Sequence, residues 1–218
     1  MIRRPVEAVV FDMDGLLIDS ERALFRTMAE IAPSFGVEVS EDFFRTLIGL
    51  PLPASSTIIL ETWGADFPLE DFLGLLRKRN RELNTAGICL KEGVVDLLDL
   101  LDDLGLPRAI CTSSAHETVI HHLGFHALVP RFDAIVARGD YEHGKPHPAP
   151  FVTAAARLGV DPVSCLALED SHNGVRAAHA AGMQVIMVPD MLDATEEMRG
   201  LCIHVGESLH DAARLLRG

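Results

Sequence analysis

The chain has 218 residues, of which 48% are hydrophobic and 23% charged, so it can bury one substantial core and is too apolar to be disordered. Its 19 Lys and Arg stand against 32 Asp and Glu, and the formal net charge of −13 repels phosphate backbones and anionic membrane surfaces. We therefore expect neither nucleic acid nor a membrane as a partner.

The cysteines are scattered along the chain, and Cys111 and Cys165 lie in apolar runs that are typical of buried strands. The apolar stretch near the N-terminus is short and meets Asp12, so it does not resemble a signal peptide. No stretch approaches transmembrane length. These features predict a cytoplasmic protein in a reducing compartment.

The apolar run from Val6 to Phe11 predicts a strand that is buried on both faces, and Asp12 and Asp14 follow it directly. Open α/β sheets bind ligands just beyond the carboxyl ends of such strands. Two acids at this point can share a divalent cation, with one serving as a nucleophile and the other exchanging protons. The alternative is that Asp and Gly merely end a strand and form a turn.

The next part of the chain, residues 17–89, is predicted to be helical, with Ser20 as a candidate N-cap. The predicted helices cover residues 21–32, 42–48, 54–63 and 69–83. Because no convincing strand pattern interrupts them, we interpret 17–89 as a helical cap subdomain inserted between two hinges. Residues 1–16 and 90–218 then form the core domain.

From Gly93 onward predicted helices and strands alternate, which is typical of a parallel sheet with helices on its faces. The predicted helices cover residues 94–104, 115–123, 151–158, 174–181 and 208–216, and the predicted strands cover 107–111, 133–137, 164–168 and 184–188. The expected fold class is α/β, with a Rossmann-like parallel sheet core and the inserted helical cap.

Polar groups follow two further predicted strands. Thr112, Ser113 and Ser114 come after one of them, where hydroxyls and N–H groups at a helix start suit an anionic oxygen. Glu169 and Asp170 come after the other. Helix capping explains each segment taken alone, but the carboxyl ends of parallel strands meet at one edge of a sheet, so together they predict one site.

Lys145 lies in a loop in which Gly144 and three prolines restrict the backbone, so its ammonium would be held in place. A solvated surface lysine is the alternative, because most lysines are exposed. A fixed ammonium beside the acidic strand ends would help an anionic substrate to approach despite the negative net charge.

Four segments in this order, Asp12–Gly15, Thr112–Ser114, Lys145–Pro146 and Glu169–Ser171, resemble the motifs of the haloacid dehalogenase-like hydrolase superfamily. The resemblance covers nearly the whole chain. A helical insertion after the first motif is similar to the branch that contains β-phosphoglucomutase-like phosphatases and mutases. Further strings resemble pseudouridine-5′-phosphatases and sugar-phosphate phosphatases of that branch, namely residues 11–21, 143–146 and 182–189.

The resemblance implies an enzyme, a Mg²⁺-dependent phosphatase that hydrolyses small phosphomonoesters through an aspartyl-phosphate intermediate. The substrates that it implies are sugar, polyol or nucleoside phosphates. In this assignment Asp12 is the nucleophile and Asp14 is the general acid and base. The Mg²⁺ ligands that it implies are Asp12, Asp170 and the backbone carbonyl of Asp14.

The resemblance further implies that Thr112, Ser113 and Lys145 bind the phosphoryl oxygens. Glu169 is expected to lie behind these groups and to orient Lys145 or a water ligand of the metal. Packing or capping is the alternative for this acid.

Basic residues of the predicted cap, Arg77, Lys78 and Arg79, could reach a distal polar group of the substrate. A solvated helix face explains them equally well. His116 follows the Thr112 segment and is a further candidate for a substrate contact, although histidines on helix surfaces commonly have no such role.

The main alternative function is a hexose-phosphate mutase of the β-phosphoglucomutase type. Such mutases carry a histidine after the hinge and an arginine in the first cap loop, where this chain has Leu24 and Leu52, so hydrolysis is favoured. A dehalogenase lacks the second aspartate, and a phospho-acceptor signalling module is shorter and lacks the helical insertion. We expect a monomer that acts on a small phosphorylated metabolite.

Overall fold

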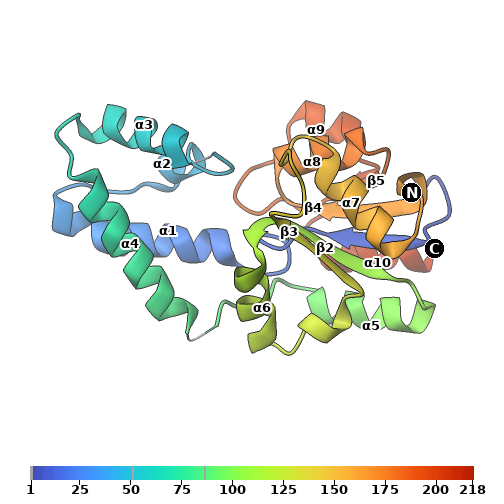
Figure 1. Cartoon of the computed structure of the whole chain (residues 1–218). Helices are drawn as coiled ribbons and strands as arrows, with labels where there is room; N and C mark the ends of the chain where they lie inside the picture. The colour runs from blue at the N-terminus through green and yellow to red at the C-terminus, as the bar shows by residue number, and fades with distance from the viewer. Residues whose placement is uncertain (1, 51, 86) are drawn as a thin grey trace. The chain divides into compact units, whose positions relative to one another are not determined.

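The chain divides into two compact units, which are described separately. The computed structural model describes residues 2–50, 52–85 and 87–218 (Figure 1). Unit 1 is made of Met1–Asp19 and Cys89–Gly218, and unit 2 is made of Ser20–Ile88. No helix within the described residues is both long enough and apolar enough to cross a membrane.

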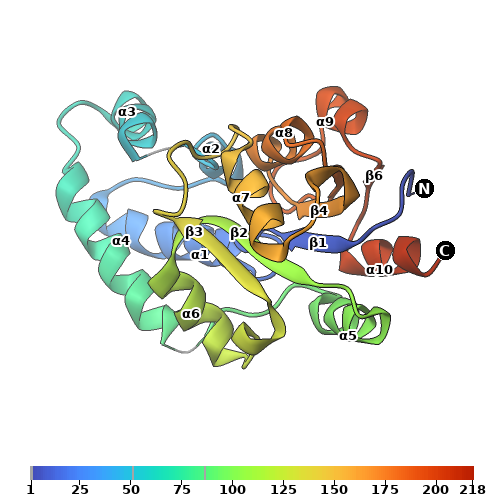
Figure 2. The same cartoon turned by 45° about the vertical axis from the view of Figure 1, so that its right-hand side comes forward.

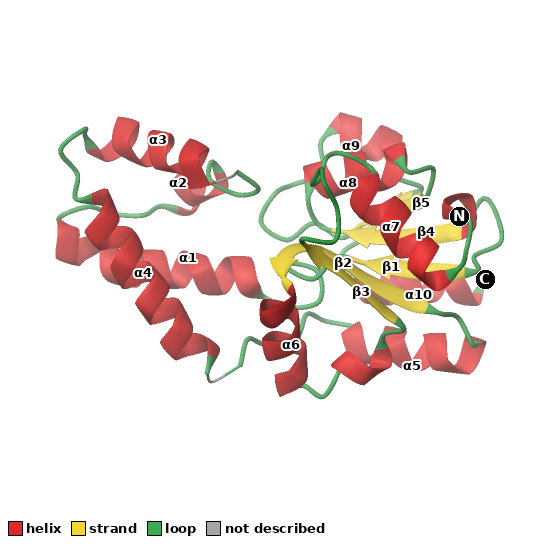
Figure 3. Ribbon diagram, in the orientation of Figure 1, coloured by secondary structure: helices red, strands yellow, loops and turns green. Residues whose placement is uncertain are grey.

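Unit 1 contains a parallel sheet in which the order of the six strands is β3-β2-β1-β4-β5-β6 (Figure 3). The strands are β1 (Ala8–Phe11), β2 (Arg108–Ala115), β3 (Ala134–Arg138), β4 (Cys165–Glu169), β5 (Gln184–Met187) and β6 (His204–Val205). The first strand has no exposed residue, because helices cover both faces of the sheet. The predicted α/β class is confirmed.

Helices pack on both faces of this sheet (Figure 2). On one face lie α7 (Ala149–Leu158), α8 (His172–Ala180) and α9 (Glu196–Leu201). On the other face lie α5 (Val94–Leu104), α6 (His116–Phe125) and α10 (Leu209–Arg217). Small residues such as Ala154, Ala155, Ala177 and Ala178 belong to the core on the first face, where they let α7 and α8 approach the strands closely.

The order of the strands reverses at β1. From β1 the chain builds outward through β2 to β3 on one side, and then returns to add β4 on the other side of β1. Such a reversal of strand order is the topological switch point at which open α/β sheets bind ligands. The residues that follow β1, β2 and β4 therefore meet at this edge.

All the regular elements among the described residues of unit 2 are helices. Its elements are α1 (Ser20–Ile31), the 3₁₀ helix η1 (Ala32–Phe35), α2 (Glu41–Arg45), α3 (Leu52–Trp63) and α4 (Leu69–Asn84). Phe35, Trp63, Phe67 and Phe72 pack against one another with ring centroids 4.8–5.9 Å apart. This aromatic cluster gives the small unit a core of its own.

Some local predictions were wrong. Ser20 is the first residue of α1, and its buried hydroxyl caps no backbone N–H among the described residues. The helix expected from Ala115 begins one residue later, because β2 runs on to Ala115 across a register shift. The elements α9 and β6 were not predicted at all.

Candidate active site

Lys145 lies at the centre of the site, with a side chain that is 6% exposed. Its Nζ donates to Asp12 Oδ1 at 2.5 Å, to Glu169 Oε1 at 2.5 Å and to the backbone carbonyl of Cys111 at 2.9 Å. An ammonium has three N–H donors, so all of them are engaged. Lys145 thus links the ends of β1, β2 and β4.

The charges of this cluster shift two pKa values. Burial raises the pKa of Asp12 to about 8, and repulsion from Glu169 and Asp14 adds to the rise while the Lys145 ammonium opposes it. Although burial by itself lowers the pKa of Lys145, attraction to Asp12 and Glu169 outweighs it and holds that pKa well above its ordinary value. Lys145 therefore stays charged. For Asp12, the positive charge of Lys145 is too weak to offset the effect of burial, and the pKa stays raised.

Glu169 is fully buried, and both of its oxygens are engaged. Oε1 accepts from Lys145, while Oε2 accepts from the backbone N–H groups of Asp170 and Ser171 at 3.2 Å and from the Ser171 hydroxyl at 3.0 Å. A methyl group at Gly174 in α8 would overlap this carboxylate. The arrangement suits an acid that fixes Lys145 in place.

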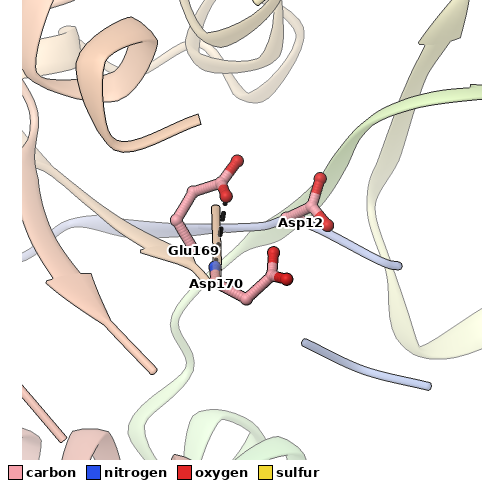
Figure 4. A group of neighbouring side chains, drawn as sticks. All are labelled: Asp12, Glu169 and Asp170. Carbon is pink, nitrogen blue, oxygen red and sulfur yellow. Dashed lines mark hydrogen bonds between the residues drawn. The ribbon is translucent and has the colours of Figure 1, made fainter. Parts of the chain in front are cut away.

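Asp12, Glu169 and Asp170 form an acidic group (Figure 4). One carboxylate oxygen from each of them lies within 4.8 Å of those of the other two. Two of these carboxylates pair with the Lys145 ammonium, and Asp170 adds a third negative charge beside them. Hard oxygen donors of this kind suit Mg²⁺. Gly15 also fits this interpretation: its φ is +81°, and a side chain there would overlap the Asp170 carboxylate. The residues present therefore fit a divalent cation, with Asp12 and Asp170 near enough to share it.

Asp14 is half-buried and contacts the end of β2. Its Oδ2 accepts from the Ser114 hydroxyl at 2.7 Å and lies 3.4 Å from the Thr112 hydroxyl. Ser113, between them, is exposed. The structure thus places Thr112 and Ser114 beside Asp14, and Ser113 beside solvent.

Two residues of the Lys145 loop were missed by sequence reasoning. The Tyr141 hydroxyl donates to the carbonyl of Thr112 at 2.9 Å. Asp140 accepts from the N–H of Ala137 at 2.9 Å and pairs with Arg157 at 3.0 Å, and the hydrogen bond from Arg157 lowers its pKa to about 2. No spacing rule connects these residues with Thr112, because the contacts arise only when the strand ends come together.

The remaining candidates have other surroundings. His116 contacts Asp140 at 2.8 Å. Within unit 2, Arg79 pairs with Glu30 at 2.9 Å, while Arg77 and Lys78 are exposed on α4. Contact of any of these four with a substrate stays a prediction.

Unit 2 also contains an apolar pocket of about 270 Å³. Leu24 and Leu52 both line it. The buried side chains of Phe44, Ile59 and Leu76 contribute further apolar walls.

Comparison with known proteins agrees with the fold. Residues 9–188 match the family described as haloacid dehalogenase-like hydrolase. The chain is 33% identical over 191 residues to hexitol phosphatase B of Escherichia coli K12, covering 85% of each chain. It is 30% identical over 181 residues to the phosphorylated carbohydrates phosphatase of Thermotoga maritima, covering 83% of this chain and 84% of that one.

Among solved structures, a HAD family hydrolase from Deinococcus radiodurans R1, with bound phosphate and sodium, superposes with a TM-score of 0.84. The two are 27% identical, and the alignment covers 98% of this chain and 96% of the other. The chain therefore belongs to the haloacid dehalogenase-like hydrolase family. It is an enzyme of the phosphatase class, a phosphoric monoester hydrolase.

Proposed function

We propose that this enzyme is a Mg²⁺-dependent phosphatase that hydrolyses small phosphomonoesters through an aspartyl-phosphate on Asp12. One observation carries the proposal: Asp12 lies beside both the Lys145 ammonium and the Asp170 carboxylate at the switch point of the sheet. A carboxylate so placed can attack an anionic phosphorus centre, because positive charge on its flank reduces the repulsion.

The cation would be held by carboxylate oxygens of Asp12 and Asp170 and by the backbone carbonyl of Asp14. When bound, it supplies positive charge that offsets the excess of carboxylates and polarises the phosphoryl oxygens. Glu169 is not needed as a ligand, since both of its oxygens already accept hydrogen bonds.

In the first half of the reaction, a carboxylate oxygen of Asp12 attacks phosphorus while the bond from phosphorus to the ester oxygen breaks. Asp14 gives its proton to that departing oxygen. In the second half, Asp14 takes a proton from water as the water oxygen attacks phosphorus and the bond to Asp12 breaks. Inorganic phosphate leaves, and both aspartates return to their starting states.

Lys145 would act mainly on Asp12, holding its carboxylate in place and keeping positive charge beside it. Thr112, Ser113 and the N–H groups that follow Thr112 would bind the phosphoryl oxygens, with Lys145 joining them by exchanging one of its present acceptors. Glu169 would keep Lys145 in position through the second short contact.

The substrate class that we propose is a sugar, polyol or nucleoside monophosphate. The names of the two phosphatase relatives support the first two classes. The bound phosphate of the Deinococcus structure supports a phosphate site in this fold. We propose further that the helices of unit 2 select among these substrates, and that the enzyme acts in the cytoplasm as a monomer.

A panel of hexitol, hexose and nucleoside monophosphates, assayed for phosphate release with Mg²⁺ and with EDTA, tests the proposal. We expect release from at least one class with Mg²⁺, none with EDTA, and none from the Asp12→Asn variant. Absence of release from the whole panel in Mg²⁺ would contradict it. Conversion of β-glucose-1-phosphate to glucose-6-phosphate without free phosphate would instead identify a mutase.

A further inference from the structure

The hydroxyl of Ser114 makes a shorter hydrogen bond to the Asp14 carboxylate than the hydroxyl of Thr112 does. Its Oγ donates to Asp14 Oδ2 at 2.7 Å, the usual length of a strong O–H···O hydrogen bond, although the two residues lie 100 positions apart in the chain. The contact to the Thr112 hydroxyl, at 3.4 Å, is at the limit for such a bond. Ser114 is therefore the main partner of this carboxyl.

The local backbone holds Ser114 in this place. The Thr112 hydroxyl accepts the N–H of Ser114 at 3.0 Å, and Tyr141 fixes the Thr112 carbonyl from the Lys145 loop. The register of β2 with β3 shifts between Cys111 and Ala115, so this segment leaves the regular ladder. An irregular strand end of this kind re-aims side chains, and such irregularities are common beside active sites.

We propose that Ser114 is a positioning residue that orients the Asp14 carboxyl for proton transfer, an inference that rests on the proposed function. Holding Oδ2 leaves Oδ1 to exchange the proton with the leaving group. A serine hydroxyl can both donate and accept a hydrogen bond. Because it donates to Oδ2 while the proton moves on Oδ1, it can hold Asp14 before and after the transfer.

Ser114 takes no part in bond breaking. The proton passes from Asp14 to the ester oxygen while the phosphorus–oxygen bond breaks, and Ser114 only fixes the carboxyl that gives it. The competing role for this hydroxyl is the one expected from the sequence, the binding of a phosphoryl oxygen. If Ser114 orients Asp14, the effect of losing its hydroxyl depends on the leaving group of the substrate. If Ser114 binds a phosphoryl oxygen, the effect does not depend on the leaving group.

An alkyl phosphate releases a strongly basic alkoxide, so its cleavage depends on the proton from Asp14. 4-Nitrophenyl phosphate releases a stable phenolate and needs that proton far less. Because kcat/KM reports only steps up to departure of the leaving group, attack by water does not enter the comparison. Loss of a phosphate contact would lower kcat/KM for both substrates alike.

The test compares Ser114→Ala with the wild-type enzyme on these two substrates in Mg²⁺. We expect kcat/KM to fall by about tenfold to a hundredfold for the alkyl phosphate and by less than about threefold for 4-nitrophenyl phosphate. Asp14→Asn should show the same asymmetry with a larger fall. Ser114→Thr, which keeps the hydroxyl, should recover most of the loss.

Ser208→Ala is the matched control. Ser208 caps α10 through its contact with the N–H of His210, so its loss costs stability without touching the site. It should leave the ratio of the two kcat/KM values unchanged. Equal losses on both substrates in Ser114→Ala would overturn the proposal in favour of phosphate binding, and no loss on either would overturn it outright. Failure of the wild-type enzyme to cleave either substrate would instead contradict the proposed function.

Discussion

Lys145 Nζ and Asp12 Oδ1 lie 2.5 Å apart in a place from which solvent is almost absent, since their side chains are 6% and 9% exposed. Glu169 approaches the same ammonium at the same distance. Buried charges without partners are costly, so the carboxylates of Asp12 and Glu169 depend on the Lys145 ammonium for their stability.

Lys145→Met should lower the free energy of unfolding by about 3–5 kcal/mol, because it leaves two buried carboxylates without their ammonium. Urea unfolding in EDTA measures this, and phosphatase activity should be lost. Lys78→Met, at an exposed position of α4, is the matched control and should change stability by less than about 0.5 kcal/mol. Equal stability of the two variants would show that the buried ion pairs of Lys145 contribute nothing to the free energy of unfolding.

Asp12→Asn should make the metal-free protein more stable, and the gain should grow with pH. The folded-state pKa of Asp12 is raised to about 8 by burial, whereas an unfolded aspartate has a pKa near 3.8. Ionising Asp12 therefore costs wild-type stability progressively as pH rises between these values. Asparagine avoids this cost, and Lys145 keeps Glu169 as a partner.

Thermal unfolding in EDTA at pH 5 and pH 8 checks this prediction. The Tm of Asp12→Asn should exceed that of the wild type by about 5 °C at pH 8 and by less at pH 5. Asp103→Asn, at an exposed position of α5, should show no such trend. A gain that shrinks with rising pH would mean that Asp12 is stabilised, not strained, by its surroundings.

Gly174→Ala should destabilise the protein by about 1–3 kcal/mol and reduce activity, because the new methyl group overlaps the Glu169 carboxylate and must displace it. Gly124→Ala is a matched change in α6, where nothing lies within 4 Å of the added atom. There alanine should gain about 0.5–1 kcal/mol from its better helix propensity. Chemical denaturation of both variants decides the matter, and similar effects at both positions would refute the close packing of Glu169.

Tyr141→Phe should raise KM several-fold with little change in kcat. It removes the hydroxyl that joins the Lys145 loop to the Thr112 carbonyl, a hydrogen bond worth about 1 kcal/mol. The groups proposed to bind phosphate would then be held less firmly before the reaction starts. Steady-state kinetics on one phosphomonoester measures this split, and a fall in kcat at constant KM would contradict it.

Much of the fold could be predicted because its signals are local. Apolar runs and helical periodicity predict β1, α1 and α5 from neighbouring residues alone. The two residues of β6 are too few to form a pattern, and the six residues of α9 show little periodicity. Both elements depend on packing against the neighbouring strand and helix.

The site could be predicted in part for a similar reason. Parallel strands align their carboxyl ends, so Asp12 and the acids Glu169 and Asp170 at the end of β4 were expected to meet, and the structure brings them together. The contact of Ser114 with Asp14 could not be foreseen, because it depends on the register shift at the end of β2. The sequence also does not show that all three N–H donors of Lys145 bond to acceptors of the protein itself.

The most direct test of the account follows the phosphoryl group itself. In a single turnover with excess enzyme and Mg²⁺, quenched by acid and digested, mass spectrometry should find one phosphoryl group on the peptide that contains Asp12. Its appearance and decay should match the release of inorganic phosphate, and it should be absent from Asp12→Asn. Phosphate release without any modified Asp12 peptide, or with unchanged speed in Asp12→Asn, would contradict the account.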